Sequence, residues 1–347
     1  MANDDSPRPR RVRYKGTHPR RFEEKYKELA PEGHAEELEK VKARGQTPAG
    51  THRSICVAEI LEVLAPQPGE AGLDATLGYG GHAQELLPRL LPGGRMVGLD
   101  VDPIELPRTE ARLRALGFDE TVLALRRMNF AGLPRLKAEF GGFDLVLADL
   151  GVSSMQIDNP ARGFSWKTNG PLDLRLNPQR GRSAAELLAA LDEPSLAELL
   201  VANSDEPHAA AIARAVHGHA IRTTRELAEL VRVAMRTEAH ESEREELTKK
   251  ALQRTFQALR IAVNDEFTVL DQFLSLLPGV LNPGGRVAIL TFHSGEDRRV
   301  KKAFQQGLRE GIYEAVAPEP IRASPEERWS NPRSTSAKLR WARLPRS

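Results

Sequence analysis

The sequence of 347 residues contains one cysteine, Cys56, and this scarcity limits the chemistry that the chain can carry. A single cysteine cannot form a disulfide within the chain, and zinc sites with two or more cysteines are excluded. The sequence also has no cluster of residues at metal-ligand spacing. We therefore expect no bound metal and a protein of a reducing compartment, which predicts a cytoplasmic location.

Long hydrophobic runs are absent as well. No stretch of about 18 apolar residues occurs, and the charged first residues do not resemble a signal peptide. These absences predict a protein without a membrane span. At roughly 100–200 residues per domain, the length predicts one large domain or two unequal ones. With 40% hydrophobic residues, such a chain can bury a sizeable core.

A strong net charge is also absent, because 50 Lys and Arg residues nearly balance 48 Asp and Glu residues. The basic residues are unevenly distributed. Residues 8–21 contain seven basic residues and no acid, and residues 328–347 contain six basic residues and no acid. Such clusters attract polyanions, although charged ends also serve solubility alone. Charge therefore leaves nucleic-acid binding open without establishing it.

From about residue 50, short apolar runs alternate with segments of helical spacing. The runs expected to form strands are 72–76, 95–102, 121–127, 143–150, 284–292 and 336–344, and helices are expected at 54–64, 82–91 and 104–116. This alternation predicts an α/β fold, a parallel sheet with helices on both faces. After the fourth strand, capping boxes starting at Ser183, Ser195 and Thr223 and a helical pattern over 245–277 predict inserted helices.

These patterns divide the chain into three expected parts. Residues 1–48 are expected to form a basic, partly disordered extension. Residues 49–155 and 256–347 are expected to form the α/β domain. The helical insertion between them, residues 156–255, is the candidate for binding a nucleic-acid substrate.

The first predicted strand ends in a glycine-rich turn. Gly78, Gly80 and Gly81 precede His82, and glycines here let the backbone approach a ligand at a helix N-terminus. Asp100 ends the next strand, 20 residues beyond Gly80, where a carboxylate can accept hydrogen bonds from ribose hydroxyls. The pattern fits NAD(P) or S-adenosylmethionine (SAM), and a simple tight turn also has such a sequence. A helix before the glycine strand and a single nucleotide-binding half favour SAM.

The fourth predicted strand ends in Asp149, which Ser153 and Ser154 follow. In an open parallel sheet, ligands bind beyond the carboxyl ends of the strands, at the switch point between the first and fourth strands. Asp149, Ser153 and Ser154 are therefore candidate catalytic residues, as hydrogen-bond acceptors for a reacting amine. The alternative is that Asp149 only caps the following turn.

Nine motifs together resemble one known family. In chain order between about His52 and Arg343 they are DATLGYGGH, LDVDP, DLGVSSMQID, RGFSW, GPLDLRLNP, GRSAAELL, TFQALRIAVNDE, NPGGRVAILTFHSGEDRRVK and NPRSTSAKLR. They resemble the RsmH (MraW) family of SAM-dependent methyltransferases, which modify N4 of a decoding-site cytosine in bacterial 16S ribosomal RNA. The resemblance implies a class I, Rossmann-like methyltransferase sheet with an all-helical insertion. It also implies SAM as methyl donor, S-adenosylhomocysteine as product, and 16S rRNA or the small ribosomal subunit as partner, and a homodimer is compatible with it.

The resemblance also implies site residues. Matched position by position, the SAM contacts fall on Gly80, Gly81, His82, Asp100, Phe130, Asp149 and Gln156, with Gly78 in the same turn. Residues 158–175 are expected to border the substrate, beginning at Asp158. There Arg162 and Arg175 are expected to bind phosphate, and Phe164 or Trp166 to stack on an extruded base. His293, after the fifth strand, is a further candidate for substrate contact, with a structural hydrogen bond as its alternative.

Alternative functions stay open at this point. They are an NAD(P)-dependent oxidoreductase and a non-catalytic RNA-binding assembly factor. A DNA amino-methyltransferase usually has a Pro-Pro-aromatic motif where this chain has Leu-Gly-Val-Ser. Methylation of cytosine at C5 needs a nucleophile that adds to the ring, commonly a cysteine. Cys56 is expected to lie far from the end of the fourth strand, which disfavours that reaction.

Overall fold

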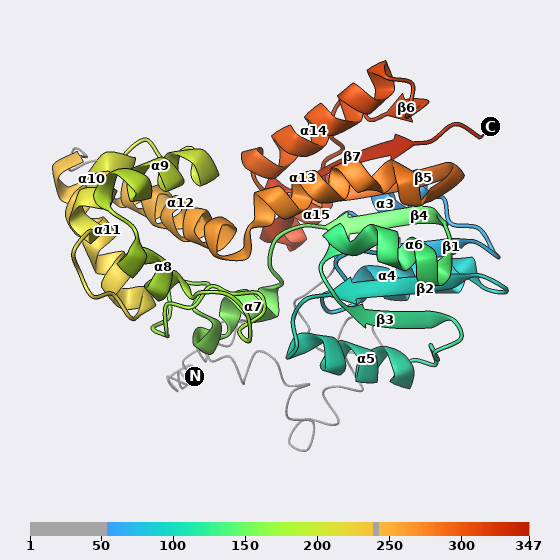
Figure 1. Cartoon of the computed structure of the whole chain (residues 1–347), viewed down its shortest axis with the longest axis horizontal. Helices are drawn as coiled ribbons and strands as arrows, with labels where there is room; N and C mark the ends of the chain where they lie inside the picture. Colours follow the sequence, from blue (N-terminus) through green and yellow to red (C-terminus); the bar gives the residue numbers. More distant parts are fainter. Residues whose placement is uncertain (1–53, 239–242, 347) are drawn as a thin grey trace, which may run out of the picture. The chain divides into compact units, whose positions relative to one another are not determined.

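The computed structural model describes residues 54–238 and 243–346, which form a seven-stranded sheet flanked by helices and a second group of helices (Figure 1). The predicted extension of residues 1–48 lies outside the described residues. The predicted α/β class is therefore confirmed.

The elements follow each other in an α/β order up to residue 149. The strands are β1 (Ala71–Asp74), β2 (Arg95–Asp100), β3 (Leu123–Arg127), β4 (Phe143–Asp149), β5 (Leu281–Thr291), β6 (Ala315–Val316) and β7 (Lys338–Arg343). The helices beside them are α3 (Val57–Leu64), α4 (Gly81–Leu90), α5 (Glu105–Ala115), α6 (Leu133–Phe140), α13 (Glu266–Leu276), α14 (Ser294–Arg309) and α15 (Pro325–Ser330). The second group contains α7 (Ser154–Asp158), α8 (Ala184–Ala190), α9 (Glu193–Ser204), α10 (Ala209–Val216), α11 (Thr224–Glu238) and α12 (Arg244–Asn264). Among these described helices, none has the length and apolarity needed to cross a membrane.

The strands are ordered β3-β2-β1-β4-β5-β7-β6. Strands β1 to β5 pair in parallel, whereas β7 runs antiparallel to β5 and to the short edge strand β6. The chain passes from β1 to β2 and β3 and then returns to place β4 on the other side of β1, so the loops that follow β1 and β4 lead in opposite directions. This is a Rossmann-like strand order, as the resemblance implied, and its switch point lies between β1 and β4, where the sequence predicted it.

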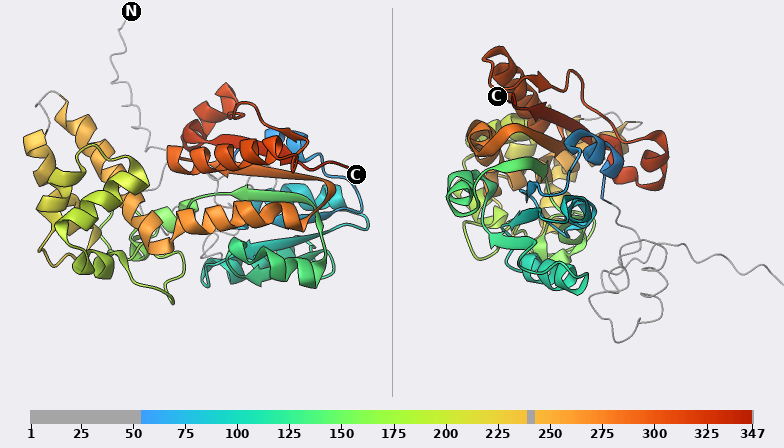
Figure 2. Two further views of the ribbon diagram at one scale, coloured as in Figure 1. Left: turned by 45° about the horizontal axis from the view of Figure 1, so that its top comes forward. Right: turned by 90° about the vertical axis from the view of Figure 1, so that its right-hand side faces the viewer.

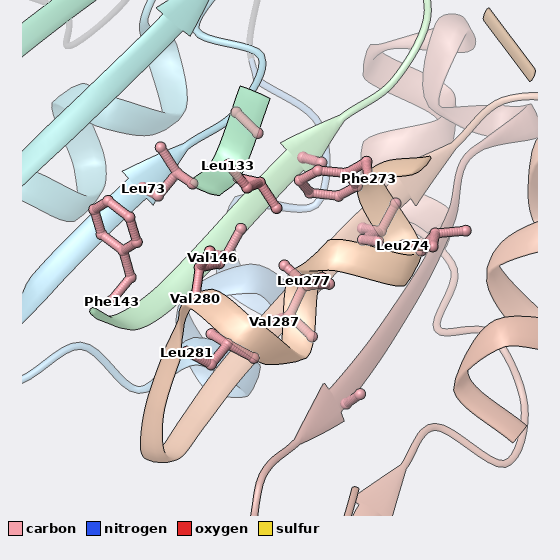
Figure 3. Close-up of a cluster of buried hydrophobic side chains, with 14 of the residues drawn as sticks. Leu73, Leu133, Phe143, Val146, Phe273, Leu274, Leu277, Val280, Leu281 and Val287 are labelled. Atoms are coloured by element: carbon pink, nitrogen blue, oxygen red, sulfur yellow. The ribbon is translucent and has the colours of Figure 1, made fainter. Parts of the chain in front are cut away.

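Alternate residues of each central strand pack against opposite layers of helices. On β4, Val146 belongs to the cluster formed with α6, α13 and α14, whereas Leu145 and Leu147 belong to the cluster formed with α3, α4 and α5. Figure 3 shows the first cluster, in which Phe273 of α13 and Leu277, the residue after α13, face the sheet. Burial on both faces explains why these strands have continuous apolar runs, and it fixes the positions of their polar ends.

The second group of helices has a hydrophobic core of its own. Residues of α8 to α12 and of the loop before them form this core, which includes Leu196, Ile212, Val231 and Phe256. The group stands at the end of the sheet toward which the β4 arrow points (Figures 1 and 2). Helix α12 continues past the expected boundary at residues 255–256 and leads directly into α13.

Three local predictions are wrong in detail. The capping box expected at Ser195 does not form, because Asp192 caps α9 and accepts the N–H of Ser195, whereas those at Ser183 and Thr223 are confirmed. The helical pattern over 245–277 is two helices, separated at Asp265, whose φ of 52° is left-handed. The segment 151–182, for which no helix was predicted, contains the short helix α7.

Candidate active site

Three aspartates lie at the carboxyl ends of three neighbouring parallel strands. Asp74 ends β1, Asp100 ends β2 and Asp149 ends β4. Burial raises the pKa of Asp74 and of Asp100 to about 6, and it raises the pKa of Asp149 to about 7. The carboxylates also repel one another, which adds to the shift at Asp74. The switch point therefore holds a compact cluster of weakly acidic carboxyl groups.

The glycine turn after β1 is held by Asp100. One carboxylate oxygen of Asp100 accepts the N–H of Gly78 at 2.9 Å, and the other accepts the N–H of Asp102 at 2.9 Å. Gly78 and Gly80 have φ values of 51° and 76°, which glycine adopts readily. At Gly80 a Cβ would also lie 3.0–3.1 Å from side chains of α5. The turn therefore requires glycine for both its conformation and its packing.

His82 connects this turn to Asp149. Nε2 of His82 lies 3.0 Å from the carbonyl oxygen of Ile55, and because a carbonyl oxygen only accepts, Nε2 is the donor. Nδ1 of His82 lies 3.6 Å from the Asp149 carboxylate. The Asp149 side chain remains 30% exposed, so a ligand can reach it.

Glu296 contributes negative charge near Asp149. Its carboxylate accepts the N–H of Phe292 at 2.9 Å and lies 3.1 Å from Nε2 of His293. Burial raises the pKa of Glu296, but His293 and Arg260 outweigh burial and lower it. Ionised Glu296 in turn repels a charge on Asp149 and raises the pKa of Asp149 further.

Asp102, which the sequence analysis did not select, is a fully buried hub beside the cluster. Its carboxylate accepts Nη1 of Arg162 at 2.7 Å and Nε2 of Gln156 at 2.8 Å. Gln156 in turn accepts the N–H of Ser153 at 2.9 Å in the capping box of α7. The hub therefore connects the loop after β2 with the loop after β4 and with the segment expected to border the substrate.

Three residues predicted to contact substrate have structural partners instead. Arg162 is 4% exposed and bonds to Asp102 and to the carbonyl oxygens of Arg175 and Leu176, so phosphate binding by Arg162 does not fit its position. Phe164 is 8% exposed within the core of the second group of helices, which does not fit stacking on a base. Arg175 forms a bidentate ion pair with Asp173.

The other predicted substrate residues are half-buried. Trp166 is half-buried with its ring 5.7 Å from that of Phe256, and Asp158 at the end of α7 lies 3.3 Å from Arg333. Nδ1 of His293 is buried and has no hydrogen-bond partner within the described part of the chain. A substrate role for these residues stays a prediction.

Three predicted site residues lie after strand ends. Phe130 follows β3 and is half-buried, and its ring stands edge-on to Phe273 at 5.0 Å, so core packing uses part of its surface. Ser154 begins α7 and is half-buried, whereas Ser153 caps this helix through its hydroxyl oxygen. The Ser153 hydroxyl oxygen is therefore already an acceptor in the fold.

The position of Cys56 corrects an expectation. Cys56 is buried at the start of α3, close enough to Asp149 for that carboxylate to affect its titration. Burial, together with Glu327, Glu59 and Asp149, raises the pKa of Cys56 to about 12. The thiol is therefore near the site but stays protonated, which opposes a role as nucleophile.

The cluster fits a ligand that carries positive charge. Within residues 54–238 and 243–346, no Lys or Arg forms an ion pair with Asp74, Asp100 or Asp149. A Cβ at Gly78 would meet only a backbone oxygen at 3.7 Å, which leaves space beside the turn. SAM carries a sulfonium and an ammonium group together with ribose hydroxyls, and all of these are matched by carboxylate acceptors.

Comparison with known proteins agrees with this chemistry. The model of the MraW methylase family matches residues 49–344. Ribosomal RNA small subunit methyltransferase H 2 of Alkaliphilus metalliredigens is 54% identical over 99% of this chain and 99% of its own length. The corresponding H 1 protein of Lachnoclostridium phytofermentans is 55% identical over 98% of this chain and 94% of its own. Among solved structures, TrmN from Thermus thermophilus is 15% identical with a TM-score of 0.39, covering 83% of this chain and 48% of its own. The chain belongs to the MraW methylase family.

Proposed function

We propose that this protein transfers a methyl group from SAM to N4 of a cytosine in 16S rRNA of the small ribosomal subunit. The observation that carries the proposal is the cluster of Asp74, Asp100 and Asp149 at the switch point of a methylase-family sheet. The names of its close relatives support an RNA of the small subunit as the substrate. Family membership argues against the oxidoreductase alternative.

The residues around the glycine turn are proposed to hold SAM. Asp100 would accept hydrogen bonds from the ribose hydroxyls. Gly78, Gly80 and Gly81 would provide a backbone surface without side chains, with His82 beside them at the start of α4. The exposed part of Phe130 is available for contact with the adenine ring, and Gln156 helps to hold the loop after β4. When bound, SAM supplies an electrophilic methyl group.

Asp149 is proposed to accept a proton from the exocyclic amine of cytosine. The amine is a weak nucleophile because its lone pair is delocalised into the ring. An acceptor on its N–H favours a more pyramidal nitrogen, and it removes the proton after the nitrogen becomes cationic. A pKa of about 7 suits this task, because the carboxylate is partly ionised at neutral pH and is a stronger base than an ordinary aspartate. Ser153 and Ser154 border the same loop.

The second group of helices is proposed to guide the RNA. Residues 156–255 would then act as the substrate domain, with Asp158, Trp166 and His293 at its junction with the sheet. A cytoplasmic location follows from a ribosomal substrate, and a homodimer remains a prediction. No metal is required by this chemistry, because the methyl donor is already activated.

Nucleoside mass spectrometry tests this proposal. Small subunits from cells lacking the enzyme are incubated with SAM and the purified protein, and the rRNA is digested to nucleosides. We expect N4-methylcytidine to appear with the wild-type protein and not with Asp149→Asn. Methyl groups on C5, or RNA binding without any methyl transfer, would contradict the proposal, the latter in favour of an assembly factor.

A further inference from the structure

Trp329 is the most exposed large hydrophobic side chain among the described residues. It is 87% exposed, whereas the others with high exposure range from 38% to 52%. A tryptophan side chain carries a large apolar surface, and leaving it in water is unfavourable unless a ligand covers it. The position of this ring therefore calls for an explanation beyond stability.

The helix that carries Trp329 is fixed on both sides. Ser324 caps α15 by accepting the N–H of Glu327 at 3.0 Å. The carboxylate of Glu327 accepts the N–H of Cys56 at 3.1 Å. Beyond the helix, Arg333 lies 3.3 Å from Asp158. The Trp329 ring is therefore presented from a short helix that is tied to two other parts of the protein.

Both ties lead to the rim of the candidate active site. Cys56 follows Ile55, whose carbonyl oxygen accepts a hydrogen bond from Nε2 of His82. Nδ1 of His82 lies 3.6 Å from the Asp149 carboxylate. Asp158 ends α7, the helix that begins just after the loop of Asp149. Trp329 therefore stands on a helix whose contacts reach residues next to the carboxylate cluster.

Ion pairs within the fold leave few unpaired basic side chains in residues 328–347, the segment that the sequence marks as basic. Four of its six basic residues form ion pairs in the fold, namely Arg333, Lys338, Arg340 and Arg343. Arg328, next to Trp329, is exposed and has no ion-pair partner among the described residues. Glu326 is exposed too, so the local net charge is small. The surface is therefore better suited to stacking than to long-range attraction.

We propose that Trp329 stacks on an unpaired RNA base next to the target cytosine, with Arg328 at the adjacent phosphate. The inference rests on the proposed function. An enzyme that modifies a base has to take it out of its stack, and the neighbouring base then loses a stacking partner. An exposed aromatic ring at the rim replaces that partner, and such stacking tolerates any base. A second copy of the chain would instead bury the ring without RNA.

Steady-state methyl transfer to small subunits from cells lacking the enzyme tests this inference. Trp329→Ala is expected to raise KM for the subunits about 10-fold, with kcat within about twofold and KM for SAM unchanged. Trp329→Phe keeps a ring and is expected to stay within about threefold of wild type. Leu308→Ala, which shortens another exposed apolar side chain far along α14, is the matched control and should leave KM unchanged.

Iodide quenching supplies a second readout. The difference in tryptophan fluorescence between wild type and Trp329→Phe gives the emission of Trp329 alone. We expect iodide to quench this emission in the free protein but not after the small ribosomal subunits are added. An unchanged KM for Trp329→Ala in an enzyme that methylates RNA would overturn this inference alone. Protection from iodide that rises with protein concentration in the absence of RNA would also overturn it, in favour of a second copy. Absence of methyl transfer by the wild type would contradict the proposed function itself.

Discussion

Replacing Asp149 by asparagine is expected to lower kcat about 100-fold or more, in the range typical for loss of a general base. The amide has nearly the same shape and still fits at the end of β4, but it cannot take a proton from the amine. The affinity for RNA is expected to change less than about threefold, because the substrate is held mainly by other residues. Single-turnover methyl transfer and a separate RNA-binding titration measure the two effects.

The pH dependence distinguishes a base from a merely structural carboxylate. Since the pKa of Asp149 is about 7 in the free protein, its ionised fraction declines below that pH. The wild-type kcat/KM for SAM, which reports groups of the enzyme before SAM binds, is therefore expected to fall as pH decreases from 8 to 6. Asp149→Asn should lack this decline. Asp271→Asn, at an exposed position on α13, serves as control and should keep the wild-type profile. Equal losses of turnover and RNA affinity in Asp149→Asn would argue against a catalytic role.

Among the substitutions named here, Arg162→Met is expected to lower the free energy of unfolding most, by about 3–5 kcal/mol. The substitution preserves much of the apolar stem but leaves the carboxylate of Asp102 buried without its cationic partner, since Asp102 is 0% exposed. Breaking a buried pair on one side costs more than removing both charges. Adding Asp102→Asn to Arg162→Met is therefore expected to recover part of the loss, as measured by urea unfolding.

An exposed ion pair supplies the control for this cycle. The side chains of Arg298 and Asp205 are 63% and 54% exposed, and Arg298→Met is expected to cost less than about 1 kcal/mol. A similarly small effect of Arg162→Met would show that the buried hub contributes little to stability. A double variant less stable than Arg162→Met would show that Asp102 does not depend on Arg162.

Local sequence features were enough to predict the strand-end part of the site. Asp100 and Asp149 each follow an apolar run long enough to be a buried strand, so their place at the carboxyl edge followed from the pattern. The glycine turn was recognisable because Gly78 and Gly80 occupy positions that require left-handed backbone. The switch point followed from the interruption after the fourth strand.

Partners that are distant in sequence could not be predicted in this way. Arg162 looked like a phosphate ligand because its pairing with Asp102, sixty positions away, exists only in the folded chain. The second acid of the motif LDVDP was the one signal for Asp102. Phe164 looked available for stacking because sequence alone does not reveal that the loop packs onto the inserted helices. Cys56 was expected to be remote, whereas the entry into α3 brings it close enough to Asp149 for that carboxylate to affect the pKa of the thiol.

Calorimetric titration with SAM in two buffers of different ionisation enthalpy tests most directly whether the strand-end carboxylates bind the methyl donor. Near pH 7 about half of Asp149 is protonated in the free protein, since its pKa is about 7. A cationic ligand favours the carboxylate, so SAM binding is predicted to release protons, and S-adenosylhomocysteine, which lacks the sulfonium charge, should release fewer. Asp100→Asn should weaken both ligands. Binding of SAM with no proton release, or with an affinity that Asp100→Asn leaves unchanged, would contradict the account.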